Sequence, residues 1–328
     1  MLNHNFFRKE KDVIVCEICP NFCKMKEGQE GICFGRKNTN GELVPLTYGE
    51  VSSTAMDPIE KKPLYHLFPG KSILSIGTYG CNFRCVFCQN CEISQSKVYT
   101  QKYSIDNLIR ICRENKSFGV AYTYNEPVIW YEFVLDAMKR CKDEGLCNVL
   151  VSNGYINEKP FMKLLPYIDG INIDLKSIRP DFYLKYVKGK LEPVKRTIEL
   201  AFGNTVLEIT NLLITDLNDS EEEMHELVDW ASSVSPDLPL HISRYFPRHK
   251  LNNPATSIEK LTGFYEIAVK KLNFVYVGNA FIEGTSNTFC PGCKKTLIER
   301  EGYRTSVSGL DNDGKCENCG KVIYGNLI

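Results

Sequence analysis

The sequence predicts an α/β fold, a partial (β/α)6 barrel of the TIM type with a cysteine-bearing segment on either side. Two observations carry this prediction. From residue 71 onward, apolar strands alternate with helical patterns and end in a further strand, which is typical of a parallel sheet with helical crossovers. Several strands also place polar residues on one alternating face, and this favours a barrel lumen over a doubly wound sheet.

The polar face is clearest in the fourth expected strand, where Asn172, Asp174 and Lys176 alternate with apolar residues. Glu208 and His241 continue the pattern on the next two strands. Acidic and basic side chains on a buried strand are costly unless they pair or line a polar cavity. We therefore expect a lumen whose chemistry lies at the carboxyl ends of the strands.

The elements follow in order. The expected strands span 72–78, 119–124, 148–153, 170–176, 206–214, 239–245 and 274–279. Ser104 is a good N-cap for the first helix, and the second has Pro127 in its first turn and Gly145 just past its end. Further helices are expected around 157–166, within 180–203, from Asp219 or Ser220, and within 255–272.

Three parts follow from this organisation. Residues 1–66 form a cysteine-rich, turn-rich segment, residues 67–280 form the barrel, and residues 281–328 form a small module with four cysteines.

Composition narrows the function classes. Lys and Arg number 40, as do Asp and Glu, so charge indicates neither a nucleic acid nor an anionic membrane as partner. No apolar run is long enough to cross a bilayer, and the first residues become charged too early for a secretory signal. Most of the 15 cysteines lie in three tight clusters, which is typical of metal sites in a reducing compartment. We expect a cytoplasmic protein.

The central cluster contains Cys81, Cys85 and Cys88, spaced C-x3-C-x2-C after the first barrel strand. Three thiolates can hold three irons of a [4Fe-4S] cluster and leave the fourth iron open to a reacting ligand. The alternative is a structural zinc knuckle completed by Cys91.

The two outer clusters each offer four thiolates. Two C-x2-C pairs, separated by 22 residues, predict a structural zinc-ribbon-like module, because so short a tail needs a metal to fold; these ligands are Cys290, Cys293, Cys316 and Cys319. The N-terminal set has the spacing C-x2-C-x3-C-x9-C and would close its site completely. Zinc and an auxiliary iron–sulfur cluster both fit this spacing; the residues are Cys16, Cys19, Cys23 and Cys33.

The run from Gly77 to Asn90, with Phe87 before its last cysteine, resembles the radical S-adenosylmethionine (radical SAM) superfamily. The resemblance implies that the open iron binds the amino and carboxylate groups of S-adenosylmethionine. It also implies that reduction cleaves this cofactor to methionine and a 5′-deoxyadenosyl radical. Phe87 would then border the cofactor.

The same resemblance assigns further cofactor contacts. Glu126 matches the glutamate of a Gly-Gly-Glu-Pro segment that grips the amino group in relatives, although Tyr124 and Asn125 replace the two glycines here. Ser152 and Asn153 match a position that contacts the sugar or carboxylate, and a plain Asn-Gly turn is the alternative. A second pair, Asp174 and Lys176, resembles the Asp-Leu-Lys strand of glycyl-radical activating enzymes; a buried structural ion pair is its alternative.

Together with residues 57–70 and 246–251, these motifs make the whole chain similar to the radical SAM enzyme of the AmmeMemoRadiSam system, a group related to pyruvate formate-lyase activating enzymes. The resemblance implies an external electron donor and partner proteins of the Memo and AMMECR families. We expect an oxidoreductase-type enzyme that abstracts hydrogen from a substrate the sequence does not identify. The alternatives are activation of a glycyl-radical enzyme and a non-catalytic metal-binding scaffold.

Overall fold

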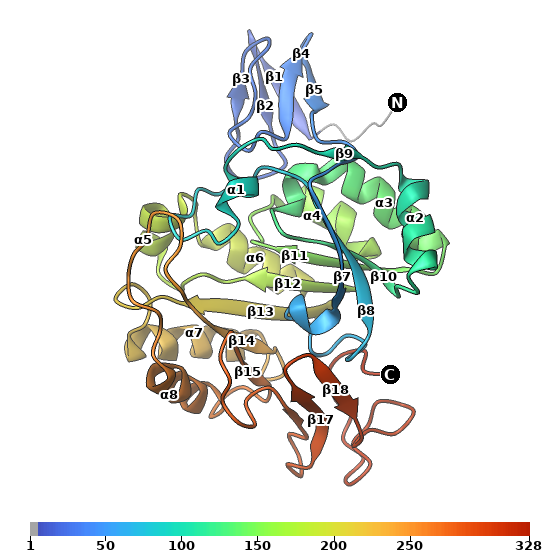
Figure 1. The fold of residues 1–328 in the computed structure, drawn as a ribbon. Coiled ribbons are helices and arrows are strands. Elements are labelled where there is room, and N and C mark those ends of the chain that lie inside the picture. Colours follow the sequence, from blue (N-terminus) through green and yellow to red (C-terminus); the bar gives the residue numbers. More distant parts are fainter. Residues whose placement is uncertain (1–5) are drawn as a thin grey trace.

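The computed structural model describes residues 6–328. Its centre is one sheet in the order β15-β14-β13-β12-β11-β10-β8-β7, in which β8 to β15 run parallel and β7 is antiparallel to β8. This open, curved sheet is the predicted partial barrel (Figure 1). Its strands are β7 (Ser53–Pro58), β8 (Ser72–Gly77), β10 (Gly119–Tyr122), β11 (Cys147–Ser152), β12 (Gly170–Asp174), β13 (Val206–Leu213), β14 (Leu240–Arg244) and β15 (Val275–Gly278).

Helices connect the parallel strands and cover the outer face of the sheet (Figure 1). Serine hydroxyls begin three of them, since Ser104, Ser220 and Ser257 each accept a hydrogen bond from a backbone N–H in the first turn, as expected of N-caps. The main helices are α2 (Ile105–Glu114), α3 (Tyr131–Asp143), α4 (Glu158–Leu164), α6 (Glu192–Ala201), α7 (Glu221–Val234) and α8 (Ile258–Ala268). Shorter helical turns are η1 (Ile59–Lys61), α1 (Cys91–Ser94), η2 (Pro127–Trp130), η3 (Leu165–Tyr167), α5 (Pro180–Phe182) and η4 (Tyr183–Val187).

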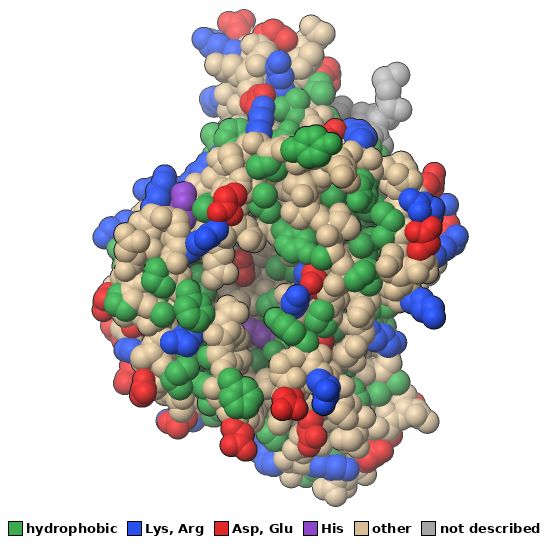
Figure 2. Space-filling model, viewed as in Figure 1, with side chains coloured by type: hydrophobic (Ala, Val, Ile, Leu, Met, Phe, Trp, Pro, Cys, Tyr) green, Lys and Arg blue, Asp and Glu red, His purple; other side chains and the backbone are tan. Residues whose placement is uncertain are grey.

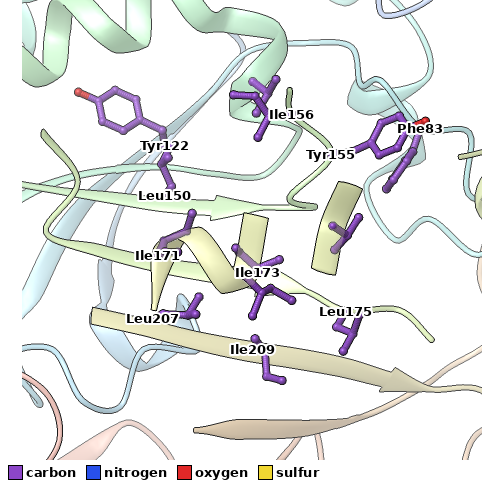
Figure 3. Close-up of a cluster of buried hydrophobic side chains, with 14 of the residues drawn as sticks. Phe83, Tyr122, Leu150, Tyr155, Ile156, Ile171, Ile173, Leu175, Leu207 and Ile209 are labelled. Atoms are coloured by element: carbon purple, nitrogen blue, oxygen red, sulfur yellow. The ribbon is translucent and has the colours of Figure 1, made fainter. Parts of the chain in front are cut away.

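The core lies between the sheet and these helices. Apolar residues on alternate positions of neighbouring strands form one continuous layer (Figure 3). Ile171 and Ile173 of β12 and Ile209 of β13 are at most 1% exposed. Burying each such side chain contributes roughly 1.5–3 kcal/mol relative to its exposed state. The alternate positions, including Asn172 and Glu208, are left facing the lumen.

Two small β modules lie at opposite ends of the barrel (Figure 1). The N-terminal module contains β1 (Phe7–Glu10), β2 (Val13–Cys16), β3 (Lys24–Met25), β4 (Arg36–Thr39) and β5 (Glu42–Pro45). The C-terminal module contains β16 (Thr288–Phe289), β17 (Thr296–Glu301) and β18 (Arg304–Val307). One short pair, β6 (Glu50–Val51) with β9 (Gln101–Lys102), ties the first module to the loop before α2.

One strand of the central sheet lies within the expected N-terminal segment, residues 1–66. Residues 53–58 form β7, which pairs with β8 from Ser53↔Gly77 to Pro58↔Ser72. This edge strand lacks a continuous apolar run, which explains why it gave no strand signal. Within residues 6–328, no helix combines the length and apolar character needed to cross a bilayer.

Candidate active site

The predicted cluster cysteines lie at the carboxyl ends of the barrel strands. Cys81, Cys85 and Cys88 all belong to the loop between β8 and α1 (residues 78–90, hereafter the cluster loop) and line one cavity of about 450 Å³. Figure 2 shows the open face of the molecule hollowed at its centre, with acidic and basic side chains inside the hollow. The cavity is therefore both polar and large enough for a small-molecule ligand.

The surroundings of these sulfurs suit metal-bound thiolates. The backbone N–H of Phe83 donates to Cys81 Sγ at 3.4 Å, and Asn153 Nδ2 lies 3.7 Å from the same sulfur. Burial raises the pKa of Cys85 to about 12 and that of Cys81 well above its ordinary value. Both thiols therefore keep their protons in the metal-free chain, and iron must displace those protons when it binds.

The spacing of the sulfurs tests which metal group fits. Among residues 6–328, the one set of cysteine, histidine or carboxylate ligands whose atoms all lie within 4.8 Å of one another is the C-terminal four-cysteine group. The central cysteines form no such set, alone or with Cys91, which also does not line the cavity. A single zinc needs its sulfurs together, whereas each thiolate of an iron–sulfur cluster binds a different iron. The central sulfurs therefore lack the close spacing of the C-terminal group, and the three cysteines fit separate irons of one cluster.

Glu126 closes one side of the cavity. It is the N-cap of η2, and its Oε1 accepts hydrogen bonds from Val128 N at 3.0 Å and Ser152 Oγ at 2.8 Å. Its Oε2 accepts one bond, from Asn153 N at 2.7 Å. Burial raises the pKa of Glu126 to about 7 in spite of these donors. Because Oε2 retains a free lone pair, Glu126 can accept a hydrogen bond from a ligand ammonium group.

Tyr124 and Asn125, which replace the two glycines of the family motif, still form the turn that precedes Glu126. Tyr124 has a φ of +70°, the left-handed conformation that glycine adopts most easily. Its hydroxyl donates to Asp57 Oδ2 at 2.9 Å. Asn125 accepts from Thr78 N at 2.9 Å and donates to Gly80 O at 2.9 Å, so its side chain braces the start of the cluster loop.

Asp174 and Lys176 also line the cavity and form an ion pair at 2.9 Å. β12 ends at Asp174, so Lys176 lies just beyond the strand. Burial opposes the charge of Lys176, but the Asp174 carboxylate outweighs it and raises the lysine pKa. Phe87 is 3% exposed and places its ring 6.0 Å from Lys176 Nζ. The pair is therefore neither fully buried nor remote from the cluster loop.

Sequence reasoning missed a third charged group in the cavity. Asp57 of β7 accepts hydrogen bonds from Lys62 Nζ at 2.8 Å and from Tyr124, and all three residues line the cavity. Lys62 is only 3% exposed, and burial lowers its pKa even though Asp57 opposes the effect. The available signal was the segment of residues 57–70, which showed a family resemblance but no chemical role.

Other polar residues of the lumen lie outside the cavity. Glu208 accepts hydrogen bonds from His241 Nε2 at 2.6 Å and from the backbone N–H of His66 at 2.7 Å, and it is fully buried. Arg244 donates to Thr256 O at 2.8 Å. None of Glu208, His241 and Arg244 lines the cavity.

The sulfurs of the four C-terminal cysteines lie close together. Cys290 Sγ and Cys319 Sγ are 3.5 Å apart, and Cys293 Sγ and Cys316 Sγ are 3.6 Å apart. Four sulfurs at about 2.3 Å from a zinc ion would be separated by about 3.8 Å. This group can bind a metal and fits one tetrahedral ion. The N-terminal cysteines lie together around a separate small cavity.

A parallel partial barrel with three cysteines on the loop after its first strand defines a class of iron–sulfur enzymes. Residues 75–231 match the Radical SAM superfamily, so the chain contains a domain of that superfamily. The chain is 38% identical over 327 residues to an uncharacterized protein of Methanocaldococcus jannaschii, with 97% of each chain covered.

A named relative and a solved structure agree with this assignment. The 4-hydroxyphenylacetate decarboxylase activating enzyme of Clostridium scatologenes is 25% identical over 166 residues, which cover 47% of this chain and 51% of the relative. The structure of a radical SAM methyltransferase from Sphaerobacter thermophilus has a TM-score of 0.52 at 14% identity and covers 67% of this chain and 69% of its own. The latter likeness concerns the fold alone.

Proposed function

We propose that this protein is a radical SAM enzyme that cleaves S-adenosylmethionine reductively and abstracts hydrogen from a substrate bound in the 450 Å³ cavity. The observation that carries the proposal is the convergence of Cys81, Cys85, Cys88 and Glu126 on this one cavity. When bound by the three cysteines, a [4Fe-4S] cluster supplies the electron that converts the sulfonium to methionine and a 5′-deoxyadenosyl radical.

The side chains around the cavity have separate tasks in this proposal. Glu126 would accept a hydrogen bond from the cofactor amino group, and Ser152 and Asn153 hold the Glu126 carboxylate in place. Asn153 also donates to Asn82 Oδ1 at 2.8 Å, so that it couples this carboxylate to the cluster loop. Positioning by such a connected set fixes the reacting groups before reduction.

The substrate side is formed by the Asp174–Lys176 and Asp57–Lys62 pairs. Both pairs place a carboxylate and an ammonium group at the cavity wall. A polar substrate with its own acidic and basic groups can exchange hydrogen bonds with these residues at little desolvation cost. We propose such a substrate in preference to an apolar one.

A second candidate function is activation of a glycyl-radical enzyme. The Asp-Leu-Lys sequence at the end of β12 and its place in the cavity favour it. Electron paramagnetic resonance would detect a glycyl radical in a partner incubated with this protein, reductant and S-adenosylmethionine. Partners of the Memo and AMMECR families, an external electron donor and a cytoplasmic location complete the proposal.

The deciding experiment measures 5′-deoxyadenosine after anaerobic reconstitution with iron and sulfide, under dithionite. We expect the native chain to form it and Cys85→Ala to form none, because two thiolates cannot retain the cluster. Cys91→Ala is the matched control and should retain the native rate, since Cys91 lies in the same region but not at the cavity. A non-catalytic scaffold would bind metal without consuming S-adenosylmethionine. That result would overturn the proposal.

A further inference from the structure

The N-terminal cysteine site, formed by Cys16, Cys19, Cys23 and Cys33, differs in geometry from the C-terminal four-cysteine group. Although all four residues line one small cavity, no three of their sulfurs belong to a set lying within 4.8 Å of one another. The four C-terminal sulfurs do meet that condition. Both sites belong to the same structure, so the sulfur spacings of the two sites can be compared directly.

A small cavity lies among the N-terminal sulfurs. The cavity has a volume of about 20 Å³, compared with roughly 10–15 Å³ for one water molecule. Its other walls are largely apolar and include Ile18, Met25, Val128 and Ile129. A tetrahedral zinc would hold all four sulfurs about 3.8 Å from one another, a spacing that these sulfurs do not have. Thiolates that bind separate irons stand apart and enclose inorganic sulfide.

A buried cation lies beside these sulfurs. Arg36 is 2% exposed, lines the same cavity and interacts electrostatically with Cys16 and Cys33. Glu132 Oε2 accepts from Arg36 Nη2 at 2.7 Å and the carbonyl of Ile129 accepts from Nη1 at 2.7 Å, which fixes the guanidinium. A fixed positive charge stabilises an anionic thiolate-bound cluster in a desolvated place.

The N-terminal site is in direct contact with the cluster loop. A Cβ built on Gly80 would lie 2.1 Å from the backbone oxygen of Cys33, so these two backbones touch. Asn21 Nδ2 donates to Asn82 O at 2.8 Å. Val128 and Ile129, which line the N-terminal cavity, directly follow the Pro127 that comes after Glu126. Little more than one loop separates the two cysteine sites.

An aromatic pair fills part of this partition. Phe83 lines the active-site cavity, and its ring centroid is 4.6 Å from that of Tyr155; Figure 3 shows the two rings side by side. Tyr155 in turn lies close enough to Cys19 to interact with it electrostatically. Packed protein therefore connects the two sites without an intervening solvent layer.

From these observations we infer that the N-terminal cysteine site holds an iron–sulfur cluster that passes electrons to the site of Cys81, Cys85 and Cys88. One electron enters from a low-potential one-electron donor protein, crosses to the active site and is consumed when the sulfonium is cleaved. The relay rests on the proposed function, but the presence of iron and sulfide at the N-terminal site does not.

The test uses the full chain with the active-site ligands removed, C81A/C85A/C88A, reconstituted anaerobically with iron and sulfide. We expect iron and acid-labile sulfide to remain bound, together with zinc at the C-terminal group. Dithionite should then produce an electron paramagnetic resonance signal that S-adenosylmethionine does not change. Introducing Cys19→Ser into this triple variant should remove the bound iron, the sulfide and the electron paramagnetic resonance signal. Introducing Cys91→Ser instead is the control and should leave all three unchanged.

Zinc at both terminal sites with no sulfide would overturn the inference, even if the native chain cleaves S-adenosylmethionine. If the triple variant does not fold, the single variant Cys19→Ser answers the same question through loss of the signal that is insensitive to S-adenosylmethionine. The relay itself predicts that Cys19→Ser slows cleavage driven by a reduced flavodoxin-type donor much more than cleavage driven by dithionite. Equal slowing by both donors would contradict the relay.

Discussion

His66 is a buried histidine whose hydrogen bonds define its protonation state. Its Nδ1 lies 2.7 Å from Tyr324 O, which can only accept, so Nδ1 carries the proton. Its Nε2 then accepts from the Tyr276 hydroxyl at 2.7 Å. Tyr276 accepts from Thr288 in turn, and Thr288 accepts from Arg300 Nη1 at 2.9 Å. A second proton on His66 would oppose the Tyr276 hydroxyl and break this chain of donors.

The stability of the protein should therefore fall in mild acid. Burial lowers the pKa of His66 from 6.5 to about 4, so between these values the unfolded chain binds a proton that the folded chain does not. Stability is retained above pH 6.5 and is lost as the pH falls towards 4; by pH 5 the loss from this residue is about 2 kcal/mol.

Urea unfolding at pH 8 and pH 5 checks this prediction. We expect His66→Gln to reduce the difference between the two free energies of unfolding by about 2 kcal/mol, because only this titration is removed. His225→Gln, at an exposed position of α7, should keep the native pH dependence. An unchanged pH dependence in His66→Gln would show that the histidine is not kept neutral by its surroundings.

At the scale of elements, the contact between the N-terminal module and the cluster loop depends on Gly80. Its φ is +90° and it has no room for a Cβ beside Cys33 O. Gly145, after α3, has a φ of +71° and open space around it. Gly145→Ala should therefore cost about 1 kcal/mol through its backbone conformation alone.

Gly80→Ala adds a steric clash to the same backbone penalty. We expect its free energy of unfolding to fall by roughly 1–3 kcal/mol more than that of Gly145→Ala. Equilibrium unfolding of the two variants measures the difference, and iron content of the reconstituted proteins shows whether the loop is displaced. Equal destabilisation of both variants would mean that the two backbones are not held in contact.

Most barrel elements could be predicted from the sequence because each has a local signal. Ser104, Ser220 and Ser257 cap helices through contacts within one turn, and β12 alternates apolar and polar residues along its length. The cysteine spacings carried equally local information. β7 and the buried Lys62 gave no such signal, since the first is defined by its pairing with β8 and the second by Asp57. Tertiary contacts determine both the strand β7 and the burial of Lys62, and a short stretch of sequence does not reveal such contacts.

At the scale of the whole molecule, the C-terminal module closes the barrel at the amino ends of its strands. Tyr324 Oη accepts from Leu207 N at 2.8 Å and donates to Leu207 O at 3.1 Å, while Arg300 Nη2 donates to Tyr65 O at 2.8 Å. The aromatic ring of Tyr276 packs in the module's own apolar cluster. The module and the barrel floor therefore form one packed unit, in which the four-cysteine group fixes a part that has only a small core of its own.

Loss of metal from this group should therefore weaken the barrel as well as the module. We expect Cys293→Ser to lose the metal of this group and several kcal/mol of stability. Amide exchange at Leu207 of β13 should become faster, because its partner Tyr324 is released. Lys294→Asn is the matched control: the position is exposed and has a φ of +63°, which asparagine tolerates. Hydrogen-exchange mass spectrometry distinguishes the outcomes. If the metal is lost while β13 keeps its native protection, the module is an independent appendage and does not close the barrel.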